Sequence, residues 1–484
     1  MNLYQQFRET AARLADHPAI LGPRPDAALS YGALDAAIGQ AAAQLAAAGV
    51  GPRQCIGLHI ASSPEYIIAT YALWKLGACV VPVPVELAPS EKAEICRRLA
   101  LDGVLTGSGG AAFCEPFRRG ASLVLDQAPL AAAQLVPIRS PRQHPAGFER
   151  LNSAFIRFTS GTTGSSKGVV LAHETIDERI RAANVALAIG PRDRVLWVLS
   201  MSYHFTVSIV AYLTFGATVV LPPNHFAAAI AGEIERRQAT LLYASPVHYG
   251  LLADYPAGRP LSSLRLAIST TSSLDLAVAE RFRERYALPI SQALGVIEIG
   301  LPCVHTDPAP HRFGSVGRVL PPYRLRLADV GLGPEHQEVF LAGPGMLDAY
   351  YDPWQPRDQI MPGGWFRTGD VGSVDSEGYL FLRGRTKDVI CVMGMKFFPQ
   401  EVERVIGRHP QVQAACVLTR ADDRFGQAVT ARVVLRGGVD SHVVASELRA
   451  LCRRELASYK VPTQFEVVAE LPRTASGKVL HRAG

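Results

Sequence analysis

The chain has 484 residues, of which 48% are hydrophobic and 19% charged, so we expect a globular protein with a large core and two or more folding units. The net charge is +6, but the basic residues form no runs and no nucleic-acid motif appears, which favours anionic small molecules over nucleic acid as partners. No stretch approaches the roughly twenty uninterrupted apolar residues of a membrane span, and the opening residues lack an apolar signal core, so we expect a cytoplasmic protein.

The first three hundred or so residues alternate strand-like and helix-like segments, the pattern of an α/β architecture with parallel strands. Helices are expected at 31–49, 89–100 and 276–286. The apolar runs that predict strands lie at 54–60, 79–85, 103–107, 122–126, 194–200, 217–223, 239–246 and 264–270.

After Pro310 the pattern changes to short strands separated by Gly and Pro, which predicts β hairpins. From about Arg385 the pattern becomes that of a small α+β domain, with a helix at 399–409 followed by two strands and another helix. We therefore predict an N-terminal domain of residues 1–384 and a C-terminal domain of residues 385–484.

The segment 155–173 carries the strongest chemical signal. An apolar strand leads into small and hydroxylated residues, followed by Lys167 and Gly168. Glycines let backbone N–H groups approach phosphate oxygens, hydroxyls add donors, and the lysine supplies a cation, so this segment has the chemistry of a phosphate loop. It is not a Walker A loop, because no glycine precedes the lysine; a flexible Ser/Gly linker is the alternative. The predicted phosphate contacts are Thr159, Ser160, Gly161, Thr162, Thr163, Gly164 and Lys167.

The string TSGTTGSSKG at 159–168 resembles the hallmark of the adenylate-forming superfamily, which contains acyl-CoA synthetases, nonribosomal peptide adenylation domains and luciferases. The resemblance implies a large N-terminal domain of parallel-sheet α/β subdomains plus a β-rich subdomain, and a small mobile α+β C-terminal domain. It also implies ATP-dependent conversion of a carboxylic acid to acyl-AMP and pyrophosphate. The acyl group then passes to the thiol of CoA or of the phosphopantetheine arm of an acyl carrier protein.

Residues 365–390 are similar to the nucleotide-binding and hinge region of that family. On this resemblance, Asp370 binds the ribose hydroxyls with help from Arg385, although an Asp after Gly is more often a turn former. Lys387 matches the hinge about which the C-terminal domain rotates. Residues 394–403 resemble the segment that enters the active site for thioester formation, in which Gly394 gives room for the thiol arm and Lys396 pairs with a phosphate.

The last motif, residues 471–482, implies that Lys478 is the catalytic lysine of adenylation, because an ammonium there stabilises charge on the α-phosphate. Glu298 matches the family's magnesium-binding glutamate. Around it the match is imperfect: Leu294 and Ile297 replace an aromatic residue and a threonine, and the segment 269–274 replaces a glycine-containing loop beside the adenine. How adenine binds is therefore open, and a degenerate, non-catalytic relative is an alternative.

The segment 202–208 lacks the aspartate with which amino-acid-activating relatives pair the substrate ammonium. Because a buried ammonium without a counter-charge is costly, an aryl or short- to medium-chain acyl acid is favoured. Loading of an unusual amino acid onto a carrier protein remains open, as does a kinase-like NTPase that releases ADP. The predicted acid-binding residues are Tyr203, His204, Phe205, Ser208, Ala293, Gly295 and Ile299.

Overall fold

The computed structural model describes residues 1–24, 27–107, 110–158, 167–256, 260–306, 312–392, 395–422, 426–436 and 441–471. The chain divides into two compact units. Unit 1 is formed by residues 1–324 and 342–364, and unit 2 by residues 325–341 and 365–484. These limits differ from the predicted boundary at 384/385, because the segment 325–341 joins the later residues.

One sheet of unit 1 has nine strands in the order β20-β19-β9-β8-β4-β3-β5-β7-β6. Its centre is parallel, since β3 pairs in parallel with both β4 and β5, and β4 with β8. The strands are β3 (Cys55–His59), β4 (Cys79–Pro82), β5 (Gly103–Thr106), β6 (Leu123–Val124), β7 (Gln134–Pro137), β8 (Ser153–Phe158), β9 (Gly168–Ala172), β19 (Ala349–Tyr350) and β20 (Gln355–Pro356).

A second sheet of unit 1 runs in the order β16-β15-β14-β13-β12-β10-β11-β1-β2. Strands β14, β13, β12, β10, β11 and β1 are parallel to their neighbours within this run, and the flanking pairs are antiparallel. The strands are β1 (Pro18–Leu21), β2 (Ala28–Ser30), β10 (Arg194–Trp197), β11 (Thr218–Val220), β12 (Leu241–Ala244), β13 (Leu266–Ser269), β14 (Ile290–Val296), β15 (Gly300–Val304) and β16 (Ser315–Val319).

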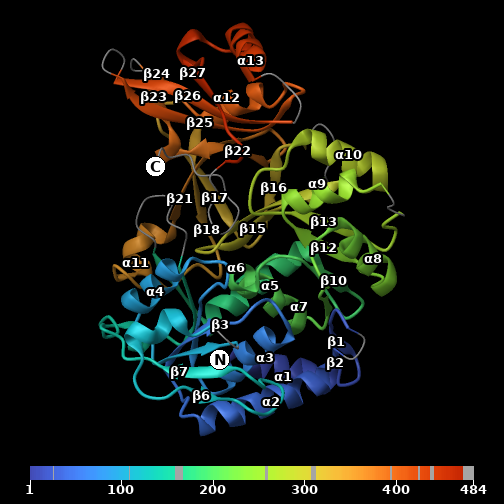
Figure 1. Cartoon of the computed structure of the whole chain (residues 1–484), viewed down its shortest axis with the longest axis vertical. Coiled ribbons are helices and arrows are strands. Elements are labelled where there is room, and N and C mark those ends of the chain that lie inside the picture. The colour runs from blue at the N-terminus through green and yellow to red at the C-terminus, as the bar shows by residue number, and fades with distance from the viewer. Residues whose placement is uncertain are drawn as a thin grey trace. The chain divides into compact units, whose positions relative to one another are not determined.

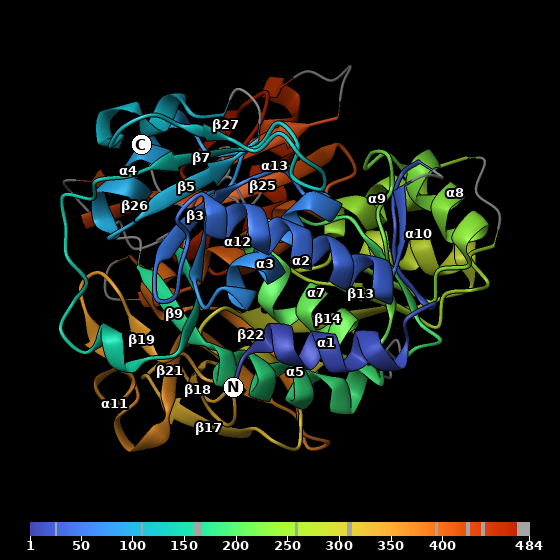
Figure 2. The same cartoon turned by 90° about the horizontal axis from the view of Figure 1, so that it is seen from below.

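Helices pack on these sheets and bury their apolar faces. In Figure 1, α8, α9 and α10 lie together beside β12 and β13, and their Ile234, Tyr249 and Phe282 share one buried core with Leu242. In Figure 2, α1, α2 and α3 lie side by side. The helices of unit 1 are α1 (Leu3–Arg13), α2 (Tyr31–Ala47), α3 (Pro64–Lys75), α4 (Pro89–Arg98), α5 (His173–Leu187), α6 (Met201–His204), α7 (Ile209–Thr214), α8 (Ala227–Arg237), α9 (Pro246–Asp254), α10 (Leu276–Tyr286) and α11 (Arg357–Ile360).

Unit 2 contains the antiparallel strands β17-β18-β21-β22, the hairpin β23-β24 and the three-stranded sheet β25-β26-β27. Helices α12 and α13 share a buried core with β25 and β26. The elements are β17 (Arg324–Asp329), β18 (Gln337–Ala342), β21 (Phe366–Val374), β22 (Tyr379–Arg385), β23 (Ile390–Val392), β24 (Met395–Phe397), α12 (Pro399–Ile406), β25 (Val412–Asp422), β26 (Gly426–Leu435), α13 (Ser441–Glu455) and β27 (Gln464–Val467).

The predicted fold class is confirmed: parallel α/β sheets precede a β-rich stretch, and the last part is a small α+β fold. The central apolar runs predicted as strands, such as 54–60, 79–85 and 103–107, are strands whose side chains are buried on both faces, which is what helices covering both sides of a parallel sheet require. The predicted strand at 122–126 is the short edge strand β6, whose two residues are exposed. None of the helices in the described ranges is long and apolar enough to cross a membrane.

Candidate functional site

The predicted acid-binding residues follow the central strands of the second sheet of unit 1. Because β10, β12, β13 and β14 are parallel neighbours, their carboxyl ends meet at one edge of the sheet, where open α/β folds bind ligands. Helix α6 with Tyr203 and His204 follows β10, Thr270 follows β13, and Ala293 and Gly295 lie in the second half of β14. The fold thus brings these dispersed segments to one edge.

His204 packs in an aromatic cluster at this edge. Its ring lies edge-on to Trp197 and Tyr243, with ring centroids 6.2 and 6.4 Å apart, while Trp197 and Tyr243 stack on each other at 5.9 Å. Tyr203 is half-buried, and burial raises the pKa of its phenol to about 12. The cluster therefore presents flat apolar faces with polar edges, which suit a ring or the start of an acyl chain.

The other predicted acid-binding residues differ in exposure. Phe205 is buried and packs against Tyr66 and Trp74 in the core. Ser208 is also buried, and its hydroxyl donates to the carbonyl of His204, so it holds the α6 turn. Ile299 is buried, Ala293 is half-buried, and Gly295 is exposed.

The loop after β13 combines close contacts with an unusual backbone. Thr270 is buried, its backbone N–H donates to the carbonyl of Ala244 at 3.0 Å, and a Cβ atom on Gly295 would lie 3.7 Å from the Thr270 hydroxyl. Thr271 has φ of +80°, a conformation that β-branched residues rarely adopt. The segment 269–274 thus contains a threonine whose backbone has a conformation typical of glycine. Backbone strain of this kind is found most often at functional sites.

Glu298 lies in the turn between β14 and β15 and is linked to Lys167 through Tyr350. The Tyr350 hydroxyl donates to Glu298 Oε1 at 3.2 Å, and Lys167 Nζ lies 4.3 Å from the centroid of the Tyr350 ring. Burial, and then the negative charge of Glu298, raise the pKa of Tyr350 well above its usual value. Tyr350 therefore stays a neutral donor that orients the Glu298 carboxylate.

A buried arginine that sequence reasoning missed holds the backbone of this turn. Arg179 of α5 is 1% exposed, and its guanidinium donates to the carbonyl of Ile297 at 2.9 Å and to that of Gly345 at 3.0 and 2.6 Å. Burial lowers the pKa of Arg179 to about 10. Leu347 N–H also donates to the carbonyl of Glu298 at 2.7 Å. An arginine in a helix gives no sequence signal of such a role, because its partners lie more than a hundred residues away.

Unit 2 carries the predicted ribose-binding pair. Asp370 on β21 and Arg385 on β22 are register partners, and Arg385 Nε lies 2.8 Å from Asp370 Oδ1. Asp370 is 6% exposed and lies within a strand, so it is not a turn former. Lys387 follows directly, in the short helix η7 (Thr386–Asp388).

Several predicted residues lie outside the described part of the chain. They are the phosphate-loop residues Thr159, Ser160, Gly161, Thr162, Thr163 and Gly164, together with Gly394 and Lys478. The backbone of Lys396 belongs to β24, but its side chain is also outside that part.

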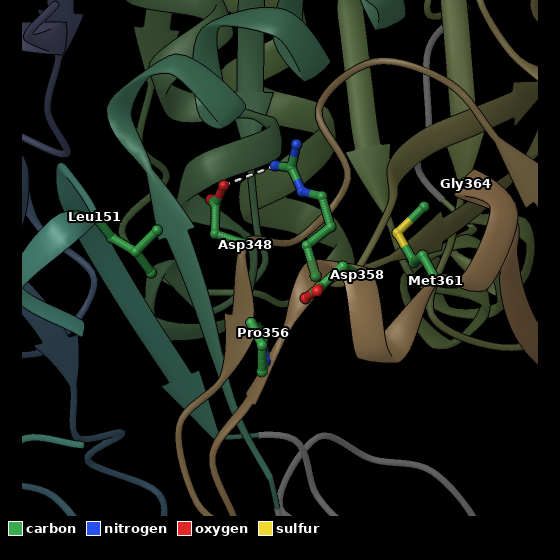
Figure 3. Close-up of a pocket in the computed structure, with 7 residues that line it drawn as sticks. Leu151, Asp348, Pro356, Asp358, Met361 and Gly364 are labelled. Atoms are coloured by element: carbon green, nitrogen blue, oxygen red, sulfur yellow. Dashed lines mark hydrogen bonds and ion pairs between the residues drawn. The ribbon is translucent and has the colours of Figure 1, made fainter. Parts of the chain in front are cut away.

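A surface cleft of about 490 Å³ lies elsewhere on unit 1 (Figure 3). Its described lining includes none of the predicted site residues. Asp348 at its edge pairs with Arg357 at 2.7 Å and accepts hydrogen bonds from Ala172 N–H and the Thr175 hydroxyl, so it caps the start of α5. The lining residues are Leu151, Asp348, Pro356, Arg357, Asp358, Met361 and Gly364.

Comparisons with known proteins identify the family to which the chain is similar. A family model described as AMP-binding enzyme matches residues 7–351, and one described as AMP-binding enzyme C-terminal domain matches residues 401–478. The chain is 31% identical to a sulfoacetate–CoA ligase of Cupriavidus necator, over 97% of this chain and 94% of the relative. It is 32% identical to an indoleacetate–CoA ligase of Aromatoleum aromaticum, over 94% of this chain and 92% of the relative. Among solved structures, an amide bond synthetase from Marinactinospora thermotolerans matches with a TM-score of 0.82 and 26% identity, over 99% of this chain and 98% of that one.

Proposed function

The chain belongs to the AMP-binding enzyme family, and we propose that its substrate is an aryl acid or a short- to medium-chain acyl acid. The protein is an ATP-dependent, AMP-forming acid–thiol ligase: it adenylates a carboxylic acid with release of pyrophosphate and then passes the acyl group to a thiol. CoA is the proposed acceptor, because the two relatives described above are named as CoA ligases. A carrier protein presents the same thiol on its phosphopantetheine arm and is the alternative acceptor.

The aromatic cluster of His204, Trp197 and Tyr243 is the observation that supports this acid class. The segment 202–208 contains no carboxylate that could pair with a substrate ammonium. Removing an ammonium from water without a counter-ion costs several kcal/mol, on the order of a thousandfold or more in binding. Zwitterionic α-amino acids are therefore poor substrates in this proposal.

In the proposed scheme, each part of ATP has its own binding residues. Residues 159–164 and Lys167 hold the phosphates, Asp370 with Arg385 holds the ribose, and Lys396 pairs with a phosphate. A carboxylate oxygen of the acid attacks the α-phosphorus, pyrophosphate leaves, and Lys478 stabilises the charge that builds there. In the second step the thiol sulfur attacks the acyl carbonyl and AMP leaves.

Glu298 is the proposed ligand for Mg²⁺, which when bound neutralises charge on the phosphates of ATP. The site fits that ion: Glu298 Oε1 accepts from Tyr350, and Oε2 accepts no hydrogen bond from a described residue. Mg²⁺ at phosphate sites is usually held by one or two carboxylates together with the substrate phosphates. That agrees with the described residues, which form no cluster of three or more His, Cys, Asp or Glu ligands.

An isotope exchange assay between pyrophosphate and ATP tests the proposal across aryl, acyl and amino acids. We expect exchange with an aryl or acyl acid, AMP as the nucleotide product, and thioester formation when CoA is added. Release of ADP would indicate a kinase-like reaction. Exchange supported only by α-amino acids would contradict the proposed acid class, and transfer only to a carrier protein would contradict the proposed acceptor.

A further inference from the structure

Arg157 is the charged residue of a mostly apolar strand, β8, which precedes the predicted phosphate loop. Its neighbours Ile156 and Phe158 pack with Tyr351 in one hydrophobic core. Because successive side chains of a strand point to opposite faces, Arg157 points to the other face of the sheet. There it meets Tyr203, one of the predicted acid-binding residues.

Among the described residues, no carboxylate lies close enough to Arg157 to form an ion pair with it. Its Nη1 donates to the backbone carbonyl of Tyr203, and the guanidinium lies 5.5 Å from the centroid of the Tyr203 ring. Its Nε is buried and has no hydrogen-bond partner, and no described carboxylate forms an ion pair with it. Burial lowers the pKa of Arg157, while the charge of Glu298 and then Tyr203 raise it, yet an arginine stays charged at neutral pH.

The Arg157 side chain is half-buried, and its buried Nε makes no hydrogen bond, which costs stability and calls for a physical explanation. A guanidinium is suited to carboxylate, sulfonate and similar oxyanions, which it binds with two parallel hydrogen bonds. Glu298 is already assigned to another cation in the proposed function. The missing anion at Arg157 is therefore expected to come from a ligand.

We propose that Arg157 binds an oxyanion of the acid substrate, so that this enzyme selects its acid partly by negative charge. The inference rests on the proposed function of the same site and narrows it. The oxyanion is either the carboxylate that is activated or a second anionic group on the acid. In both cases Tyr203 forms the other wall, because its ring and its backbone carbonyl orient the guanidinium.

The test compares wild type with Arg157→Gln, which keeps a polar side chain, and Arg157→Lys, which keeps the charge but loses the planar donor pair. Arg194→Gln is the matched control, because Arg194 is also a half-buried strand arginine that donates to a backbone carbonyl, that of Arg237 at 2.6 Å, but lies at the amino end of β10. The probes are benzoate, isophthalate, butyrate and succinate. Melting temperature with and without each acid and pyrophosphate exchange are measured.

We expect Arg157→Gln without ligand to melt no lower than wild type, since the variant removes a half-buried charge that forms no ion pair with a described residue. The acid-induced rise in melting temperature should disappear, and the KM for the acid should rise about tenfold or more, against less than about threefold for ATP. Arg157→Lys should be intermediate. A loss confined to isophthalate and succinate identifies a second anionic group, and an equal loss for all four probes identifies the activated carboxylate.

Unchanged acid KM and unchanged acid-induced shifts in Arg157→Gln would overturn the inference while leaving the proposed function intact. An equal or larger rise in the KM for ATP would also overturn it, by assigning Arg157 to the nucleotide. If wild type supported exchange with none of the aryl and acyl acids, the proposed function itself would fail.

Discussion

At the scale of single residues, Thr271 has a backbone conformation that suits glycine, with φ of +80°. Such a conformation costs a residue with a Cβ roughly 1–2 kcal/mol, while glycine loses roughly 0.5–1 kcal/mol through the entropy of the unfolded chain. We predict that Thr271→Gly raises the free energy of unfolding by up to about 1 kcal/mol, measured by urea denaturation. Thr270→Gly is the control: Thr270 lacks the positive φ and its side chain is buried, so that variant should lose stability.

His204 is predicted to contact the acid and not ATP. Replacing it with alanine removes the ring that lies edge-on to Trp197 and Tyr243. The KM for the acid should therefore rise about tenfold, while the KM for ATP changes little. Steady-state pyrophosphate exchange with each substrate varied in turn measures both values. His409→Ala is the control, since His409 pairs with Glu447 on unit 2; an unchanged acid KM in His204→Ala would remove this residue from the site.

A matched variant distinguishes two roles of the Asp370 carboxylate: its ion pair with Arg385, which stabilises the fold, and its proposed contact with the ribose of ATP. Glu338 is also buried and lies in the same sheet of unit 2. Its Oε1 forms an ion pair with Arg367 Nε at 2.6 Å. Asp370→Asn and Glu338→Gln should both lower the melting temperature. Only Asp370→Asn should raise the Kd for ATP, by about 10- to 100-fold, because hydrogen bonds to a charged group contribute roughly 1.5–3 kcal/mol. Equal ATP affinities in a fluorescence titration would refute the ribose contact.

At the scale of elements, α5 positions the turn that carries Glu298, and glycines make the fit possible. A Cβ atom on Gly345, where φ is +67°, would lie 2.5 Å from Arg179 Cβ, and one on Gly300 would lie 3.1 Å from it. Only glycine allows the chain to pass so close to the helix while accepting hydrogen bonds from Arg179.

We therefore predict that Gly345→Ala lowers the free energy of unfolding by about 2–4 kcal/mol, as the sum of backbone strain and overpacking. Gly49→Ala is the matched control in the same unit, because Gly49 has φ of +89° but no atom within 4 Å of its added Cβ. The control should show the strain alone, roughly 1–2 kcal/mol. The two variants are compared by their loss in free energy of unfolding, measured by chemical denaturation, and the difference is the contribution of the close contact with α5. Equal losses would show that α5 shifts to make room for the added Cβ at no cost in stability.

At the scale of the whole molecule, the proposed mobile C-terminal domain depends on backbone rotation at Lys387. Proline at this position limits φ to about −65°. We predict that Lys387→Pro retains pyrophosphate exchange but lowers thioester formation about tenfold or more, because the second step needs the rotated arrangement. Lys387→Ala is the control that removes the side chain and leaves the backbone free. Full thioester yield in the proline variant, measured by chromatography of the acyl-CoA product, would refute the hinge.

The sequence by itself was sufficient for the fold class and the family. Parallel strands covered on both faces must be apolar throughout, so runs such as 79–85 and 239–246 can be read as strands without knowing their neighbours. The motif at 159–168 is local as well, because a phosphate loop is built from consecutive residues. Asp370 and Glu298 could be named for the same reason: each lies in a short motif.

Only the tertiary structure decided which side chains surround these motifs. Arg179 contacts Gly345, 166 positions later, and Tyr350 contacts Glu298, 52 positions earlier. Arg157 meets Tyr203 because a strand of one sheet faces a helix that follows a strand of the other. Such contacts depend on chain topology, which brings together elements that are distant in the sequence and leaves no local pattern in it. An arginine inside the fold has the same letter in the sequence as one on the surface, and only the packing shows that Arg157 forms no ion pair with a described residue.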